Sequence, residues 1–194
     1  MRFRESSFAE VLPVWRDQLW PGRVSPIEQV SPIGFDLKFS PTLREARPKF
    51  WVGESGGQIL GTVSGYATGS GQYRARGLYL SPSQRGKGWS KALLDLVAGQ
   101  AMAEVCEMVW TIPRQGAWPA YEAYGFKMVS EWTSEGMEFG PNCLPEKKKS
   151  KILEFCETLW QPLPLMIWIA AIVEVAIGNY ADTGILVAIN ILNA

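Results

Sequence analysis

Histidine is absent from the 194-residue sequence, and cysteine is scarce. Without histidine, Ser-His and Cys-His catalysis and His-ligated metal sites are excluded, which leaves Glu, Tyr, Lys or Cys for proton transfer. We therefore expect no metal cofactor. The three cysteines, Cys106, Cys143 and Cys156, form no CxxC pair and leave one cysteine over. This pattern favours reduced thiols in a cytosolic compartment over a disulfide framework.

A surplus of charge of either sign is also missing. The 19 Lys and Arg residues equal the 19 Asp and Glu residues, so composition gives no argument for a nucleic-acid partner, and we expect none. The N-terminus, MRFRESSFAEVLPVW, lacks the continuous apolar core of a signal peptide. We expect this part of the chain to lie in the cytoplasm.

The composition divides the chain into two parts. Residues 1–144 interleave apolar residues with charge, turns and glycine, as a water-soluble domain requires. Residues 145–158, PEKKKSKILEFCET, are charged and are expected to form a linker. Residues 159–194 are almost entirely apolar. We see no internal repeat.

The first part has the pattern of a mixed α/β domain. Apolar periodicity predicts helices at 8–20 (limited by Pro13), 89–105 and 117–124, the last closed by Gly125. A proline-rich loop at 21–32 leads into a second short helix. Short apolar runs bounded by turn residues predict the strands, with Gly56-Gly57 as a hairpin turn; these runs are 49–55, 58–68, 73–81, 107–113, 126–132 and 136–144. The order predicts one sheet flanked by helices.

The loop SPSQRGKGWS, residues 81–90, joins a predicted strand to a predicted helix. Gly86 and Gly88 allow the backbone to approach a ligand closely, and a helix N-terminus offers free N–H donors and a partial positive charge. With Arg85, Lys87 and Lys91 around it, the loop suits phosphate or pyrophosphate. The spacings of the Walker A and GxGxxG motifs are not met. The alternative is a plain strand-to-helix turn with solvated charges.

Two motifs in order carry a family resemblance. RGKGWS at 85–90, between LYLSP and KALL, resembles the [QR]xxGx[GA] signature of the GNAT family, the Gcn5-related N-acetyltransferases. AYEAYGF at 120–126 resembles the second hallmark of that family, a tyrosine four residues before a Gly-Phe pair. The resemblance covers residues 1–144 and implies the α/β (α+β) GNAT fold, a mixed sheet flanked by helices.

The resemblance implies acetyl-CoA as co-substrate and an amine as acceptor. The pyrophosphate of acetyl-CoA would lie on the backbone of Arg85, Gly86, Lys87, Gly88, Trp89 and Ser90. The backbone of Tyr79 and Leu80 would bond the pantetheine and polarise the thioester carbonyl. Tyr121 would protonate the departing thiolate; alternatively, it packs on the sheet as a residue of an amphipathic helix.

Some positions depart from the family pattern. Ser90 replaces a Gly or Ala, which a small side chain should tolerate. Arg114 stands where many members place an asparagine that bonds the pantetheine, so that contact is in doubt. The strand at 73–81 carries no Asp or Glu as general base. A carboxylate elsewhere such as Glu54, a water relay or solvent would then deprotonate the acceptor.

Acceptor contacts are expected in LWPGRVSPIEQV, residues 19–30, where the acceptor-binding region of the family usually falls. Arg23 and Glu28 are the candidates. Several aromatic residues either line an acceptor pocket or, as is commoner in a small domain, belong to the core; these are Trp15, Trp20, Phe50, Trp51, Trp110 and Trp118. Cys106 is most simply a small buried residue.

The apolar second part predicts an incomplete transmembrane hairpin. Residues 159–177 are at the lower limit of the length needed to cross a bilayer, and Lys147, Lys148, Lys149 and Lys151 precede them on the cytoplasmic side. Residues 183–194 reach only about 18 Å, too short to cross. Alternatives are a buried helical hairpin or a loose tail that aggregates.

Residues 144–194 resemble the first transmembrane hairpin of plasma-membrane P-type proton pumps with its preceding linker. The DKTGT and TGES motifs and a nucleotide domain are missing from the sequence, which excludes transport by this chain. The sequence therefore predicts an N-acetyltransferase domain fused to a pump fragment and associated with a membrane through 159–194. The alternative is a GNAT-like module that binds acyl-CoA or a partner without turnover.

Overall fold

The computed structural model describes residues 1–134, 138–148, 170 and 172. The chain divides into two compact units, Met1–Lys148 and Lys149–Ala194, and the description below concerns the first. The predicted hairpin at 159–194 lies outside the described residues except for Ala170 and Ile172. In the part of the chain that the structure describes, no helix has the length and apolarity to span a membrane.

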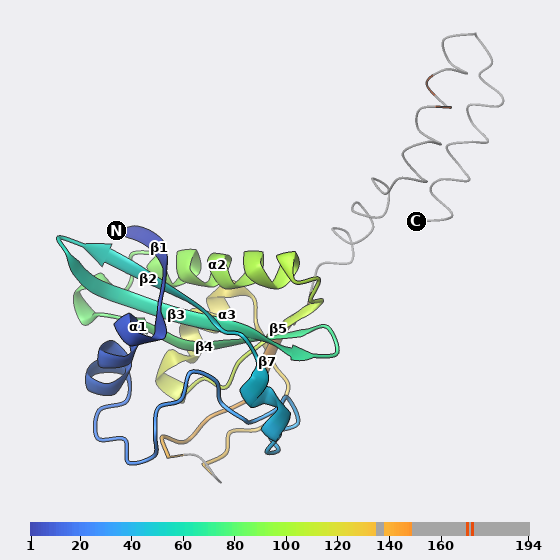
Figure 1. Cartoon of the computed structure of the whole chain (residues 1–194), viewed down its shortest axis with the longest axis horizontal. Coiled ribbons are helices and arrows are strands. Elements are labelled where there is room, and N and C mark those ends of the chain that lie inside the picture. The colour runs from blue at the N-terminus through green and yellow to red at the C-terminus, as the bar shows by residue number, and fades with distance from the viewer. Residues whose placement is uncertain (135–137, 149–169, 171, 173–194) are drawn as a thin grey trace. The chain divides into compact units, whose positions relative to one another are not determined.

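The first unit is built on a seven-stranded sheet with the order β1-β2-β3-β4-β5-β7-β6 (Figure 1). Only β4 and β5 run parallel; every other neighbouring pair is antiparallel. The strands are β1 (Arg2–Ser6), β2 (Lys49–Ser55), β3 (Gln58–Gly69), β4 (Gln72–Leu80), β5 (Met108–Trp110), β6 (Lys127–Met128) and β7 (Pro145–Lys148). The helices are α1 (Phe8–Val14), α2 (Trp89–Ala103) and α3 (Trp118–Tyr124).

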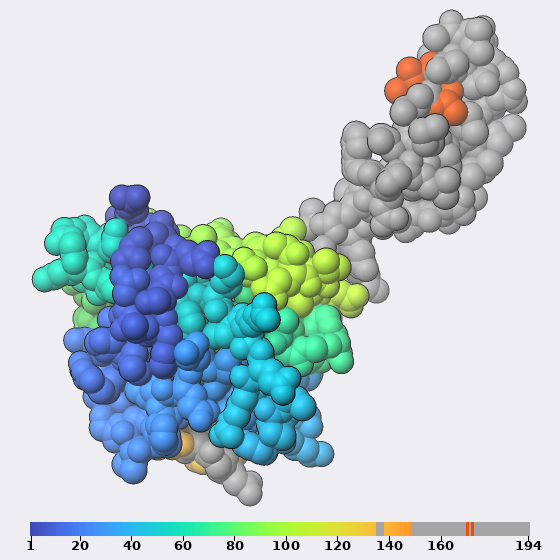
Figure 2. Space-filling model, in the orientation of Figure 1, coloured from blue at the N-terminus to red at the C-terminus, as the bar shows by residue number. Residues whose placement is uncertain are grey.

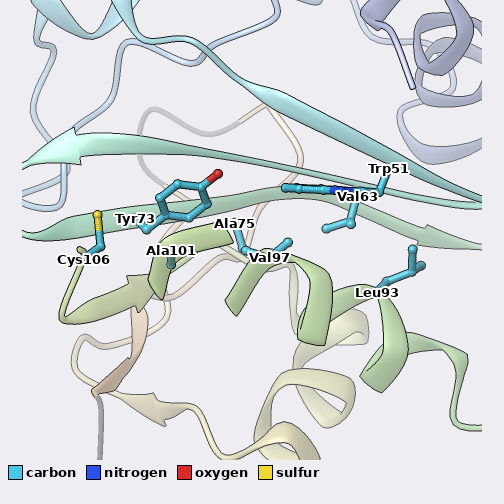
Figure 3. Close-up of a cluster of buried hydrophobic side chains, with 8 residues drawn as sticks. All are labelled: Trp51, Val63, Tyr73, Ala75, Leu93, Val97, Ala101 and Cys106. Carbon is cyan, nitrogen blue, oxygen red and sulfur yellow. The ribbon is translucent and has the colours of Figure 1, made fainter. Parts of the chain in front are cut away.

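The two faces of the sheet carry different layers. On one face, Trp51, Val63, Tyr73 and Ala75 pack against α2, as Figure 3 shows. On the other face, Phe50 and Val52 of β2 pack against α1. Alternate residues of one strand thus serve both cores, because successive side chains point to opposite faces. The connection from residue 20 to residue 48, largely irregular, lies on the α1 side and forms the blue lower surface in Figure 2.

The α/β class and the order of elements from 49 to 125 are confirmed, while the ends of the domain differ from the expectation. Strand β1 was not predicted, because its charged residues, Arg2, Arg4 and Glu5, obscure the apolar alternation that indicates a strand. The strand expected at 126–132 is reduced to Lys127–Met128, and residues 138–144 form only a bridge at Asn142. The first helix contains Pro13 and continues beyond Val14 as a π-helix over Trp15–Leu19.

The linker expected from residue 145 is wrong for its first four residues, which form β7 between β5 and β6. The sequence PEKK lacks apolar alternation, yet the pleat still separates its side chains. Lys147 reaches back to α3, where its Nζ donates to the Tyr124 carbonyl at 2.8 Å. Glu146 and Lys148 pair with each other at 3.1 Å. Charged side chains with long apolar stems can therefore occupy a strand that composition assigns to a linker.

Candidate active site

A gap opens in the sheet between β4 and β5. The two strands pair over three residues, Gln72–Arg74 with Met108–Trp110. Beyond Arg74, β4 continues to Leu80, and no described strand pairs with its edge on that side. A cavity of about 370 Å³ lies there, with Ala75–Leu78 on one wall and Thr111–Arg114 on the other. An extended ligand can use the unpaired edge of β4 as a further strand would.

A β-bulge in β4 widens this gap. Between the pairs Thr62 with Tyr79 and Ser64 with Arg76, β4 has one residue more than β3. Gly77 adopts a φ of 67°, and its carbonyl accepts from Trp15 Nε1 at 3.1 Å and from Thr62 Oγ1 at 3.0 Å. A Cβ at Gly77 would lie 2.1 Å from the Trp15 ring. The bulge therefore needs glycine, and it bends β4 away from β5.

The loop after β4 has the geometry of an anion site. Gly86 and Gly88 adopt φ of 73° and 78°, and Gly88 is the N-cap of α2. In the described part of the chain, the N–H groups of Gly86, Lys87 and Gly88 donate to no backbone carbonyl. The N–H groups of Trp89 and Ser90, in the first turn of α2, likewise donate to no backbone carbonyl in the described part of the chain. Consecutive free donors at a helix N-terminus attract phosphate.

The side chains around the loop are only partly engaged. Arg85 Nε donates to the Leu80 carbonyl at 3.1 Å, so this carbonyl is already used. Lys87 Nζ is 3.5 Å from Gln84 Oε1 and solvent-exposed. The Trp89 indole packs against Phe3, and its buried N–H has no partner among the described residues. Lys91 Nζ pairs with Asp95 at 2.8 Å, whereas Arg85 and Lys87 form no ion pair with a described residue and can turn toward a bound anion.

Tyr121 lies on α3 and lines the cavity, as its predicted role requires. It is 3 % exposed and packs edge-on against Phe126. Burial raises the pKa of the Tyr121 phenol to about 12, although the Thr111 side chain acts in the opposite direction. The phenol is therefore protonated throughout the neutral range, which suits a proton donor.

Of three further predicted site residues, Arg23 and Arg114 line the cavity, whereas Tyr79 is not among the described residues that line it. Arg114 Nη2 donates to the Leu19 carbonyl, and its guanidinium lies 4.9 Å from the centre of the Phe139 ring. Tyr79 is buried and donates from its hydroxyl to Gln18 Oε1 at 3.0 Å.

The two predicted carboxylates are not brought to the cavity. Glu54 pairs with Arg4 of β1 at 3.0 Å. The Glu28 side chain is 3.5 Å from Arg44 and lines a separate, shallower depression. The acidic side chain that does line the cavity is Glu138, which sequence reasoning missed because its segment was expected to be a strand. Hydrogen bonds from Ser25 and from the Val24 N–H lower the pKa of Glu138, so it is a weak base.

Two buried arginines of β4 were also missed. Arg74 and Arg76 are 5 % and 8 % exposed and line the cavity. The sequence YRARGLYL could have indicated them, because its cationic residues alternate with apolar residues in a strand that is otherwise buried. Among the aromatic residues, Trp20 lines the cavity. The others pack in cores, as the commoner reading expected, and Cys106 is buried.

Comparison with known proteins assigns the two parts of the chain separately. The profile of the family described as "Acetyltransferase (GNAT) family" matches residues 13–126. The profile described as "Cation transporter/ATPase, N-terminus" matches residues 132–174.

Curated relatives match each part over a limited length. N-acetyltransferase 8 of Rattus norvegicus is 36% identical over 91 residues, which is 42% of this chain and 40% of that protein. "Probable proton ATPase 1A" of Leishmania donovani is 47% identical over 57 residues, which is 29% of this chain and 6% of that protein. The chain thus spans well under half the length of these relatives.

Solved structures support the fold. A protein from Lactobacillus plantarum described as an N-acetyltransferase superposes with a TM-score of 0.56 and 14% identity, over 76% of this chain and 97% of that one. At this identity the likeness concerns the fold alone. The family profile, however, covers more than half of the sequence, including the loop at 85–90 and Tyr121. The chain therefore belongs to the GNAT family of acetyltransferases, and a proton-ATPase-like segment follows its acetyltransferase domain.

Proposed function

We propose that residues 1–148 transfer an acetyl group from acetyl-CoA to a primary amine. The observation that carries this proposal is the continuity of three features: the glycine loop at the N-terminus of α2, the unpaired edge of β4, and the cavity with Tyr121 in its wall. Pyrophosphate would bind the N–H groups from Gly86 to Ser90. The pantetheine arm would then follow β4 toward the cavity.

The reaction balances without an added oxidant or metal. The neutral amine of the acceptor attacks the thioester carbonyl carbon, forming the C–N bond and a tetrahedral intermediate. Collapse of the intermediate breaks the C–S bond, and the sulfur leaves with the electron pair. Tyr121 gives its proton to this thiolate, and the proton lost by the acceptor nitrogen restores the phenol through solvent.

The loop is tested by binding of acetyl-CoA to the full chain in mild detergent, measured by calorimetry. Gly86→Glu places a negative charge where the pyrophosphate would bind, so the affinity should fall at least about tenfold. Gly69→Glu is the matched control, because Gly69 also has a positive φ and open space around its Cβ position but lies at the β3–β4 turn. Equal affinities in both variants would exclude the loop as the site.

Tyr121→Phe separates catalysis from binding. Loss of a general acid should reduce the rate of CoA release about 100-fold or more, whereas affinity for acetyl-CoA should change less than about twofold. Tyr124→Phe on the same helix is the control, since Tyr124 bonds Asp95 outside the cavity. An unchanged rate in Tyr121→Phe would remove Tyr121 from the mechanism.

A second candidate function is binding of acyl-CoA or a partner without turnover. It is favoured by the lack of a free carboxylate among the described residues that line the cavity, where Glu138 is the one acid and lies 3.7 Å from Arg23. If acetyl-CoA binds but no amine is acetylated at any pH between 7 and 10, this second function replaces the first.

A further inference from the structure

Four arginines line the cavity where the acceptor amine would bind. We call Arg23, Arg74, Arg76 and Arg114 the arginine cluster. All four line the cavity, and Glu138 is the one acid among the lining residues that the structure describes. Burial, with repulsion from Arg74 and Arg23 added, lowers the pKa of Arg76 to about 10, so it stays charged at neutral pH. The cavity thus holds an excess of positive charge in a chain whose total charge is balanced.

The two most buried members are held by carbonyls and aromatic faces. Arg74 Nη1 donates to the carbonyls of Ser31 and Ile33 at 3.4 and 2.7 Å, and its guanidinium lies 4.7 Å from the centre of the Trp110 ring. The Arg74 Nε is buried and has no hydrogen-bond partner among the described residues. No ion pair links Arg74 to an acid in the described part of the chain.

Arg76 repeats the arrangement two residues further along β4. Its Nη1 donates to the carbonyls of Glu28 and Gln29 at 2.7 and 3.2 Å, and its guanidinium lies about 5 Å from two indole rings, Trp15 and Trp20. Both arginines use one nitrogen to hold the connection that follows α1. The remaining nitrogens of each fork are available to a ligand.

Holding a loop by its carbonyls does not require charge. A glutamine or asparagine amide would donate the same bonds without the free energy that burial of a cation costs. Buried charges in proteins are normally paired, and here the aromatic faces compensate only in part. Because no described residue pairs with the Nε of Arg74, a ligand is the candidate source of the pairing anion.

We infer that the acceptor is a small primary amine that carries a carboxylate, such as an α-amino acid, and that the arginine cluster binds this carboxylate. This inference rests on the proposed acetyl transfer. The cavity is small, and Leu19, Ile33 and Phe139 supply apolar walls, which fit the body of such a molecule. Polyamines and lysine side chains are disfavoured by repulsion. The same field favours the neutral, nucleophilic form of the amine, which offsets the missing general base.

The test compares amino acids with their amides as acceptors for the full chain. L-leucine, L-phenylalanine and L-methionine are each paired with the corresponding amide, which differs only in the carboxylate. At pH 8 more of the amide is present as neutral amine, so amine ionisation cannot favour the acid. We expect kcat/KM for at least one acid to exceed that of its amide about tenfold to 100-fold, the contribution of one charge-assisted hydrogen bond. Equal values for every pair overturn the inference but leave acetyl transfer intact.

Variants identify the cluster as the cause. In Arg76→Gln, the ratio of kcat/KM between acid and amide should fall toward one, whereas a merely structural role would lower both values alike. Arg23→Gln provides the same test at a less buried position if Arg76→Gln does not fold. Arg16→Gln is the control, because Arg16 is exposed and pairs with Asp17 outside the cavity; its ratio should not change. An undiminished ratio in folded cluster variants overturns the inference.

A binding measurement keeps the two proposals separable if no amine is acetylated. Calorimetry with saturating CoA then compares N-acetyl-L-leucine with N-acetyl-L-leucinamide on the full chain. Tighter binding of the acid, lost in Arg76→Gln or Arg23→Gln, supports the carboxylate site although the acetyl transfer has failed. Equal binding, or no binding of either probe, overturns the site.

Discussion

Burial of its phenol makes Tyr121 contribute to the pH dependence of stability. Burial raises the pKa of Tyr121 to about 12, and burial also raises the pKa of Tyr73 and of Tyr124. A phenol with a raised pKa in the folded state binds its proton more tightly there than in the unfolded chain. Its contribution to stability is fully present below pH 10, the pKa in the unfolded chain, and is lost as the pH rises toward the folded-state pKa.

We therefore expect the free energy of unfolding to fall above pH 10, by about 1.4 kcal/mol per pH unit for Tyr121 and for Tyr73, and by less for Tyr124, which is partly exposed to solvent. Tyr121→Phe should remove one such contribution between pH 10 and 12. Urea unfolding at pH 9, 10 and 11, followed by fluorescence, gives the slope for both proteins. Identical slopes above pH 10 would contradict the burial of the Tyr121 phenol.

Substitution by alanine should change the free energy of unfolding in opposite directions at Gly77 and at Gly99. At Gly77 a methyl group would lie against the buried Trp15 ring, and the φ of 67° strains any other residue. Gly77→Ala should lower the free energy of unfolding by about 3 kcal/mol. At Gly99, inside α2, nothing lies within 4 Å, so Gly99→Ala should raise it by about 1 kcal/mol. Chemical denaturation of the two variants checks both signs; equal effects would contradict the bulge.

At the scale of elements, β7 connects the end of the domain to the helix that carries Tyr121. Lys147 donates to the last turn of α3, and its Nζ lies 3.7 Å from the centre of the Tyr124 ring. Lys147→Met keeps the apolar stem but removes this contact, so the free energy of unfolding should fall by about 1–2 kcal/mol. Lys148→Met is the control, since Lys148 is largely exposed; a change below about 0.5 kcal/mol is expected. Equal losses would contradict the docking of β7 on α3.

The elements that could be predicted from sequence are those whose apolar residues repeat with one period. Strands β2 to β4 and helix α2 have that property, and their ends were placed within a few residues. Strands β1 and β7 have charged residues at nearly every position, so their assignment depends on neighbouring strands that the sequence does not identify. The pairing of β7 with both β5 and β6 is a long-range contact of this kind.

The candidate site shows the same difference between features set by local sequence and features set by long-range contacts. The glycine turn at 85–90 and the position of Tyr121 on a helix could be predicted, because local sequence determines a glycine turn, a helix start and a helix face; the roles of these residues stay predictions. The arginine cluster could not, because it joins β4, the connection after α1 and the segment after β5, which are far apart in sequence. Glu54 was predicted as a possible base and Glu28 from the position of its segment in the family, but their partners, Arg4 and Arg44, hold them elsewhere.

At the scale of the whole chain, the two family matches do not coincide with the structural units. The ATPase-type match begins at residue 132, yet Phe139 and Asn142 line the cavity and 145–148 form β7. The first unit continues to Lys148. The proton-ATPase-like segment thus supplies β7, the strand between β5 and β6, and part of the cavity lining. Up to Lys148, the residues of this segment belong to the same structural unit as the acetyltransferase residues.

The apolar sequence beyond Lys148 leads to a prediction about membranes. Residues 159–177 contain one acid, Glu174, and basic residues precede them. The free energy gained by moving the apolar side chains into a bilayer should therefore exceed the cost of burying Glu174. The preceding lysines should stay near anionic headgroups. We expect the full chain to float with vesicles of neutral and anionic lipid in a density gradient, and a chain of residues 1–148 to stay at the bottom. Flotation that resists high salt would indicate insertion, whereas release by salt would indicate attraction through the lysines alone. Pelleting of the full chain without lipid would favour an aggregating tail, and a full chain that stays soluble and at the bottom would contradict membrane association.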